Sequence, residues 1–151
     1  MQPRRLRILT GGLLLAALAA CAGPQRPAAE PAALAPVRAE VLLEARETVL
    51  GEAIIYPTDA PAKVTMAIIT IEPGAEIGWH THAVPLAAYL LDGELEVTYR
   101  GHGPRVYRAG DALVEAMAVP HAGHNRGAET VRILAVFAGA GGLALSDPAP
   151  E

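Results

Sequence analysis

Histidines are the residues of this 151-residue chain whose type and spacing are best suited to chemistry, and all five lie between residues 80 and 124. His80 and His82 are two residues apart, so on a β-strand both imidazoles point to the same face of the sheet. Two imidazoles offer neutral nitrogen ligands of intermediate softness, which suit Fe, Zn, Cu, Ni or Mn. Because His-x-His pairs also occur without a metal, this spacing alone is a weak indication of a metal site.

The elements that would position these histidines are short strands. From residue 40 onward, short apolar runs are broken by turn residues at intervals of roughly ten residues, a spacing typical of an all-β sandwich or barrel. The turns carry residues that favour tight backbone conformations, such as Asp92-Gly93. Residues 41–46 are the one segment compatible with a helical turn. We predict strands over residues 49–56, 64–72, 76–80, 86–91, 94–100, 105–108, 112–115, 118–124 and 131–137.

Two sequence motifs resemble those of the cupin superfamily. Residues 74–82, GAEIGWHTH, followed by Gly93, are similar to the first motif, in which a glycine and five residues precede His-x-His. Residues 110–125, GDALVEAMAVPHAGHN, are similar to the second, in which a histidine lies between a glycine and an asparagine. The resemblance covers residues 64–137 and implies an all-β fold, a small double-stranded β-helix or jelly-roll barrel. In that fold one divalent transition metal ion (Fe, Mn, Zn, Cu or Ni) is bound by the residues that correspond to His80, His82 and His121.

The chain departs from the cupin motifs at the fourth ligand. The carboxylate that accompanies the three histidines in the family falls at Leu86, and Ala116 and Ala118 stand where the second motif has Pro and Gly. Three interpretations stay open. The site is a three-histidine site with open positions for water or substrate, or Glu115 supplies the missing anionic ligand, or no metal binds.

The remaining polar residues of this region are weaker site candidates. Glu115 and His124 are weak candidates for catalytic roles, although the three-residue offset of His124 from His121 turns it to the opposite face of a regular strand. Tyr89 and Asn125 are candidates for contacts with the substrate. Tyr89 would line the cavity, whereas Asn125 has an alternative role as a hydrogen-bonded anchor at a strand end.

The resemblance implies a metal-binding protein that acts on a small molecule, and the leading hypothesis is a dioxygenase-like or isomerase-like metalloenzyme. The alternative is a non-catalytic ligand-binding, metal-binding or sensing protein with a degenerate site. No Ser/His/Asp or Cys/His arrangement competes with these hypotheses, and no Gly-rich phosphate loop is present.

Residues 1–20 have the features of a secretory signal peptide. Arg4, Arg5 and Arg7 precede an uncharged apolar run of 13 residues, which is short of the roughly 20 that a spanning helix needs. The sequence Leu-Ala-Ala before Cys21 resembles a bacterial lipobox, which implies lipidation of Cys21 and attachment to the bilayer. We therefore expect export and lipid anchoring to the cell envelope, facing the periplasm, with the outer membrane favoured by Ala22.

The same reading divides the chain into four parts. They are a lipoprotein signal peptide over residues 1–20, a lipidated and disordered Pro/Ala-rich tether over 21–39, a barrel over 40–145, and a disordered tail over 146–151. Without residues 1–20, nine basic residues face 16 acidic ones, a net charge of −7. This balance disfavours nucleic acid as a partner. An apolar edge strand over residues 49–56 would allow the barrel to form a homodimer.

Overall fold

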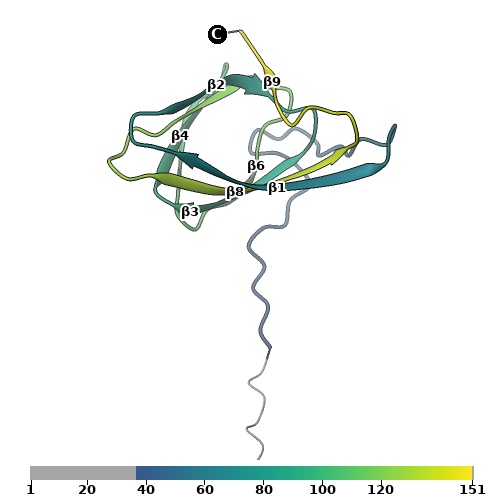
Figure 1. The fold of residues 1–151 in the computed structure, drawn as a ribbon, viewed down its shortest axis with the longest axis horizontal. Coiled ribbons are helices and arrows are strands. Elements are labelled where there is room, and N and C mark those ends of the chain that lie inside the picture. Colours follow the sequence, from purple (N-terminus) through teal and green to yellow (C-terminus); the bar gives the residue numbers. More distant parts are fainter. Residues whose placement is uncertain (1–36, 151) are drawn as a thin grey trace, which may run out of the picture. The chain divides into compact units, whose positions relative to one another are not determined.

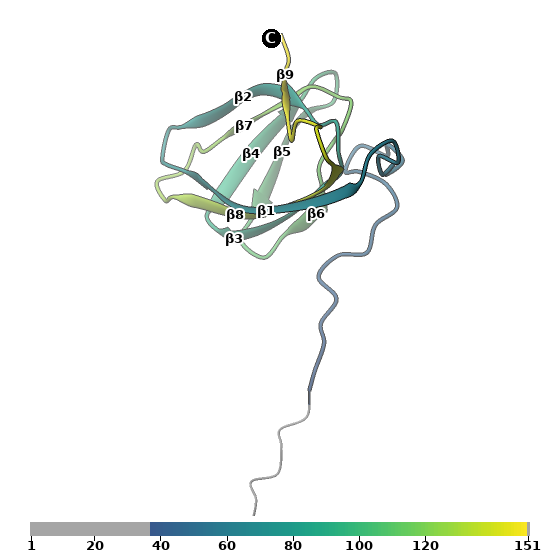
Figure 2. The same ribbon diagram turned by 45° about the vertical axis from the view of Figure 1, so that its right-hand side comes forward.

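The structure is a computed structural model that describes residues 37–150. Two antiparallel sheets face each other, and the chain crosses between them at most of its connections (Figures 1 and 2). In sheet order, the four-stranded sheet comprises β1 (Ala62–Ile71), β8 (Val131–Ala140), β3 (Leu86–Asp92) and β6 (Ala112–Val114). The five-stranded sheet comprises β5 (Gly103–Arg108), β4 (Glu94–Tyr99), β7 (His121–His124), β2 (Glu76–Thr81) and β9 (Asp147–Pro148).

The predicted fold class, a small double-stranded β-helix, is confirmed. Every regular element between residues 37 and 150 is a strand, and eight of the nine predicted strands correspond to β1 to β8. No helix in this range has the length and apolar character needed to cross a membrane. The predicted signal peptide, Cys21 and most of the predicted tether lie outside the described residues.

The core lies between the two sheets because apolar residues alternate along the strands. In β4, Leu95, Val97 and Tyr99 are buried, with at most 5% of their surface exposed, and the residues between them are more exposed. Leu86 and Leu90 face the same interior from β3 in the other sheet. Burial of such side chains contributes about 1.5–3 kcal/mol each relative to leaving them in water.

The predicted strand over residues 49–56 is wrong. This segment is a turn closed by an isolated bridge between Glu47 and Ala53, and Gly51 adopts a positive φ of 81° within it. The amide of Thr48 donates to the carbonyl of Glu52 at 2.8 Å, so the turn uses backbone groups that a strand would offer to a neighbour. The segment therefore does not provide the edge strand expected for a homodimer, and residues 41–46 do not form a helical turn either.

The C-terminal segment, predicted to be a disordered tail over residues 146–151, differs from that prediction. Residues 147–148 form β9, which pairs with β2 in the register His80 to Pro148 and Thr81 to Asp147. The amide of Ala149 also donates to the carbonyl of Trp79 at 2.9 Å. This segment therefore lies directly against the strand that carries His80.

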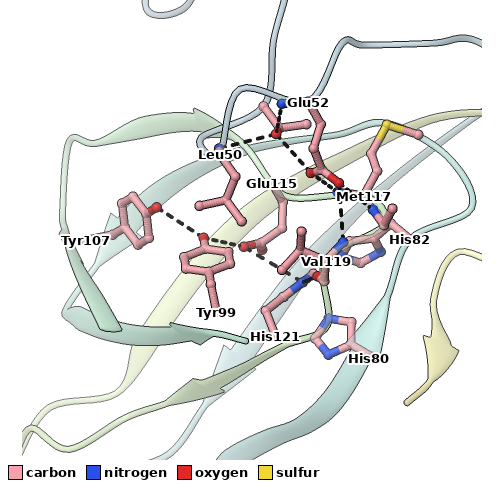
Figure 3. A network of polar contacts seen from close by, with 12 residues as sticks. Leu50, Glu52, His80, His82, Tyr99, Tyr107, Glu115, Met117, Val119 and His121 are labelled. Atoms are coloured by element: carbon pink, nitrogen blue, oxygen red, sulfur yellow. Dashed lines mark hydrogen bonds and ion pairs between the residues drawn. The ribbon is translucent and has the colours of Figure 1, made fainter. Parts of the chain in front are cut away.

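β7 begins at His121 rather than at residue 118. The backbone amides of the preceding loop donate to a side chain and not to a neighbouring strand. The Glu52 carboxylate accepts hydrogen bonds from the amides of Met117 and Ala118, both at 2.8 Å, and from the hydroxyl of Thr48 at 3.0 Å (Figure 3). Burial opposes ionisation of Glu52, but these donors outweigh it and lower the pKa of the carboxyl. Glu52 thus fixes the loop that leads into His121.

We predict that Glu52→Gln destabilises the fold at pH 7 by about 1–3 kcal/mol, because one amide nitrogen of Gln would face backbone donors. The folded-state pKa of Glu52 lies below its ordinary value of 4.5, so its contribution is present above that pH and is lost as the pH falls through the folded-state value. Urea unfolding should therefore show a gap between the two proteins at pH 7 that narrows below about pH 4.5.

The matched control is Glu44→Gln, which changes an exposed carboxylate on the segment before the turn and should alter stability by less than about 0.5 kcal/mol. A gap for Glu52→Gln that is equally large at pH 7 and pH 3.5 would show that the charge of Glu52 is not the cause.

Candidate metal centre

Three histidines, from the paired strands β2 and β7 and from the residue that follows β2, lie close together (Figure 3). His80 lies in β2 directly opposite His121 in β7, and His82 follows the end of β2. Their ring centroids are 4.4 to 5.2 Å apart. One nitrogen from each ring lies within 4.8 Å of the others, so the three side chains could share one metal ion.

The tautomer of each ring is fixed by a backbone carbonyl. Nδ1 of His80 lies 2.7 Å from the carbonyl oxygen of Gly78, Nδ1 of His82 lies 2.7 Å from that of Leu145, and Nδ1 of His121 lies 2.9 Å from that of Val119. A carbonyl oxygen only accepts hydrogen bonds, so Nδ1 carries the proton and Nε2 keeps its lone pair. Metal-binding histidines show this same pattern, in which the second nitrogen donates to a carbonyl or carboxylate.

Nε2 of His82 and Nε2 of His121 are buried and have no hydrogen-bond partner. A buried polar atom without a partner costs about 1–3 kcal/mol, so native proteins rarely leave one unexplained. Here two such atoms point to the same place. Their lone pairs, together with that of His80, fit the donor set of a transition metal ion.

Burial keeps the three imidazoles neutral. It lowers the pKa of His80, His82 and His121, and it outweighs the opposing effect of the carbonyl hydrogen bonds. The effect is largest for His82, whose pKa falls to about 4. The neutral form is the one that binds metals, so all three rings are in the ligand form near pH 7.

Glu115, which follows β6, is the acidic side chain closest to this cluster. Its Oε1 lies 3.9 Å from Nε2 of His121, beyond hydrogen-bond distance, and accepts a hydrogen bond of 2.8 Å from the hydroxyl of Tyr99. The Tyr99 oxygen is in turn 3.1 Å from that of Tyr107. Burial raises the pKa of Glu115, although the Tyr99 hydrogen bond and the electrostatic interaction with His80 oppose it.

The histidines and Glu115 open onto a cavity of about 250 Å³ between the two sheets. Leu86 lines this cavity, so an apolar side chain occupies the position where the cupin resemblance places a carboxylate ligand. The other apolar side chains of the wall come from both sheets and are Ile69, Ile77, Ala88, Leu90, Leu95, Val97, Leu113, Ile133, Ala135 and Phe137.

Two of the weaker candidates lie outside this cavity. His124 is on the opposite face of β7, as its offset from His121 indicated, and its Nδ1 lies 3.2 Å from a carboxylate oxygen of Glu76. Tyr89 is on the outer face of β3, next to Leu42, and does not line the cavity as predicted. β3 is apolar on both faces, so its sequence did not indicate which face is buried.

Asn125 has the hydrogen bonds of a structural anchor, the alternative role expected for it, and it does not line the cavity beside the histidines. Its Nδ2 donates to the carbonyls of Ile71 and Glu129, both at 2.8 Å, and its Oδ1 accepts from the amide of Gly127 at 3.0 Å. The side chain is buried and its donors and acceptor are used in joining the end of β7 to the neighbouring loop.

Three contributions to the site were missed by the sequence reasoning. The carbonyl of Leu145 holds His82, Glu52 fixes the loop before His121, and Tyr99 supports Glu115. The alternation of Leu95, Val97 and Tyr99 could have placed Tyr99 inside the barrel. No residue type identifies Leu145, because its backbone makes the contact, and Glu52 lies in a segment that resembled a strand.

Solved structures share this fold at low sequence identity. The oxalate decarboxylase of Lactobacillus farciminis, in a formate complex, is 23% identical with a TM-score of 0.50, over 56% of this chain and 26% of that one. The DMSP lyase DddQ of Ruegeria pomeroyi is 22% identical with a TM-score of 0.51, over 57% of this chain and 43% of that one. This chain thus spans about a quarter and less than half of these two proteins.

A third structure is closer in size. An uncharacterized conserved protein with a double-stranded beta-helix domain from Klebsiella pneumoniae is 20% identical with a TM-score of 0.50, over 64% of this chain and 86% of that one. No curated protein matches this chain. Residues 67–137 match the family model described as "Cupin domain", and this range holds the three histidines and Glu115. Residues 67–137 of this barrel are therefore similar to a cupin domain.

Proposed function

We propose that His80, His82 and His121 bind one divalent transition metal ion, and that the protein is a metalloenzyme acting on a small molecule in the adjoining cavity. The observation that carries the proposal is the pair of buried, unpartnered Nε2 atoms on His82 and His121. Their tautomers are already set by carbonyls, so the ligand atoms are organised before any ion arrives.

When bound, the metal ion would supply Lewis acidity or, if redox-active, activation of dioxygen. The proton chemistry would belong to Glu115. Its carboxyl shares the cavity with the histidines, its pKa is raised by burial, and the Tyr99 hydroxyl holds one of its oxygens in place. A carboxyl with these properties suits proton transfer at pH values above its usual range.

The alternative is a non-catalytic protein that binds or senses a small ligand or a metal. The replacement of the expected carboxylate by Leu86 favours it, because the site then lacks its usual anionic ligand. Glu115 favours the enzyme, since its Oε1 lies only 3.9 Å from Nε2 of His121 and could act as a ligand or as a base. Turnover that disappears in Glu115→Gln while metal content stays unchanged would distinguish the enzyme from the binding protein.

We also propose that the barrel is exported and anchored to the envelope, facing the periplasm, through lipidated Cys21. The support is the sequence of residues 1–21, with three arginines, a short apolar run and a lipobox-like Leu-Ala-Ala-Cys. Two or more acyl chains hold a protein to a bilayer more firmly than one does. Placement in the outer membrane rests on Ala22 after the cysteine.

We also propose a homodimer, with β1 as the edge strand of the interface instead of residues 49–56. β1 is at the edge of its sheet, and Val64, Met66 and Ile68 on its outer face are 68%, 67% and 47% exposed. An antiparallel pairing of two β1 strands centred on Met66 would place Val64 opposite Ile68 of the partner subunit. The apolar stripe is therefore self-complementary, as a two-fold interface requires.

For the metal site, we predict that the purified protein holds about one equivalent of a transition metal, and that His82→Ala and His121→Ala each lose it. Removing a ligand should weaken affinity by more than the roughly 10–100-fold typical of losing a supporting partner. Elemental analysis and chelator competition measure both. The matched control is His102→Ala, an exposed histidine outside the cavity, which should keep full metal content. A folded protein that takes up no metal would contradict the proposal.

For the anchor, we predict that the unchanged chain incorporates labelled palmitate and fractionates with membranes. Cys21→Ala should lose the label and move to the soluble fraction of the periplasm, because the only thiol available for acylation is gone. A label that persists in Cys21→Ala would refute lipidation at this residue.

For the dimer, we predict that Met66→Arg converts a dimer into a monomer in sedimentation velocity at tens of micromolar, since it would place two like charges opposite each other at the centre of the interface. Val106→Arg on β5, at a residue that is also exposed, is the control and should leave the dimer intact. A monomeric unchanged protein at these concentrations would overturn this assignment of β1.

A further inference from the structure

The cavity beside the histidines has one polar corner, and the rest of its wall is apolar. Polar side chains of the wall gather around the three histidines and Glu115, with Tyr107 and Ser146 added. The rest of the wall is formed by buried aliphatic side chains, among them Leu90, Leu95, Val97, Leu113 and Ile133. A ligand that fills this space must therefore have a single polar end.

The wall contains no lysine or arginine among the residues described. A metal ion at the three neutral imidazoles would be its one centre of positive charge, and Glu115 offers only negative charge or a neutral acid. A second carboxylate on the ligand would point into apolar surface without a partner, which is strongly unfavourable. This charge distribution selects a monoanionic head group and disfavours dianions.

The volume limits the size of the apolar body. The cavity measures about 250 Å³. A dry apolar cavity of about 150 Å³ in another protein is sufficient for benzene. The space here therefore fits a body of roughly six to eight carbon atoms plus a head group, on the same scale. Leu86 extends the apolar wall to the edge of the histidine cluster, and Phe137 stands edge-on to the ring of His82 at 5.9 Å between centroids.

We propose that the ligand of this cavity is a small amphiphile, with one anionic oxygen head that coordinates the metal ion and a compact aliphatic or aromatic body. The inference rests on the proposed metal site, which supplies the contact for the head. It goes beyond that proposal by assigning the wall a role in selection, in which apolar surface favours monocarboxylate-like molecules over short polar acids and over dicarboxylates.

The test is a binding series on the Cys21→Ala chain, which carries no acyl group that could compete for the cavity. The chain is loaded with Co(II), whose absorption spectrum reports coordination of the head, and titrated by calorimetry with acetate, butyrate, hexanoate, octanoate, dodecanoate, benzoate and adipate. Affinity should rise about fourfold per methylene, the factor expected for moving one methylene out of water. It should level off near octanoate, and adipate, which adds a second carboxylate at the far end of the hexanoate chain, should bind more weakly than hexanoate.

A variant of the cavity wall distinguishes its contribution to binding from that of the ligand's head group. Val97→Thr places a hydroxyl of similar shape in the wall and should weaken hexanoate binding by about five- to tenfold, leaving acetate binding and Co(II) content unchanged. Val106→Thr, an exposed residue on β5, should change neither. The ligand series on the unchanged wall tests the inference even if Val97→Thr fails to fold.

The outcomes show separately whether this inference or the proposed metal site fails. Failure to load Co(II), which is seen before any ligand is added, overturns the metal site. Co(II) that binds and responds to acetate and hexanoate equally, or to adipate most strongly, leaves the metal site standing and overturns the assignment of an amphiphilic ligand.

Discussion

Three hydrogen bonds between imidazole Nδ1–H groups and backbone carbonyls determine what this site can be. The carbonyls of Gly78, Leu145 and Val119 fix the protons of His80, His82 and His121 on one side of each ring. Each Nε2 lone pair is thereby left facing the other two. Because burial also lowers the pKa of the rings, the cluster does not become a set of repelling cations near neutral pH. Burial and carbonyl contacts together make the three rings a ligand set.

These three carbonyls come from three separate segments of the chain. Gly78 lies in β2 itself, whereas Val119 lies in a loop held by the Glu52 carboxylate and Leu145 lies just before β9. Glu52 and Leu145 are both outside residues 67–137, the range that matches the cupin family. The three histidines therefore lie within the range that matches the family model, while two of the contacts that orient them come from residues outside that range.

Features set by local sequence could be predicted, and features set by distant contacts could not. The His-x-His spacing and the alternation in β4 follow from the two-residue period of a strand, so the histidine pair and the buried face of β4 were readable. The Asp92-Gly93 turn was also predicted, from its residue types. The structure shows why glycine is needed there, since Gly93 adopts a φ of 80° and an added Cβ would lie 3.0 Å from the carbonyl oxygen of Thr130. Residues 49–56 resembled a strand because they are apolar, but Glu52 within them bonds to a loop 65 residues away. β9 depends likewise on pairing with a strand far back in the sequence.

The apolar residues on both faces of β3 explain why Tyr89 was expected in the cavity and why the wall of the cavity is apolar. The run over Leu86–Asp92 is apolar on both faces, so the sequence did not show that Tyr89 points outward, and Leu86, Ala88 and Leu90 face the cavity instead. The acid of this site is instead Glu115, which follows the neighbouring strand β6. Its amide donates to the carbonyl of Leu86 at 2.9 Å, and its carboxylate is held by a hydrogen bond from the phenol of Tyr99. Because Oε1 of Glu115 both accepts that hydrogen bond and lies nearest to His121, the carboxylate is confined to one corner. The side chains of β3 that face the cavity offer a ligand only dispersion contacts. The strand whose orientation could not be predicted from its sequence therefore makes this part of the cavity apolar.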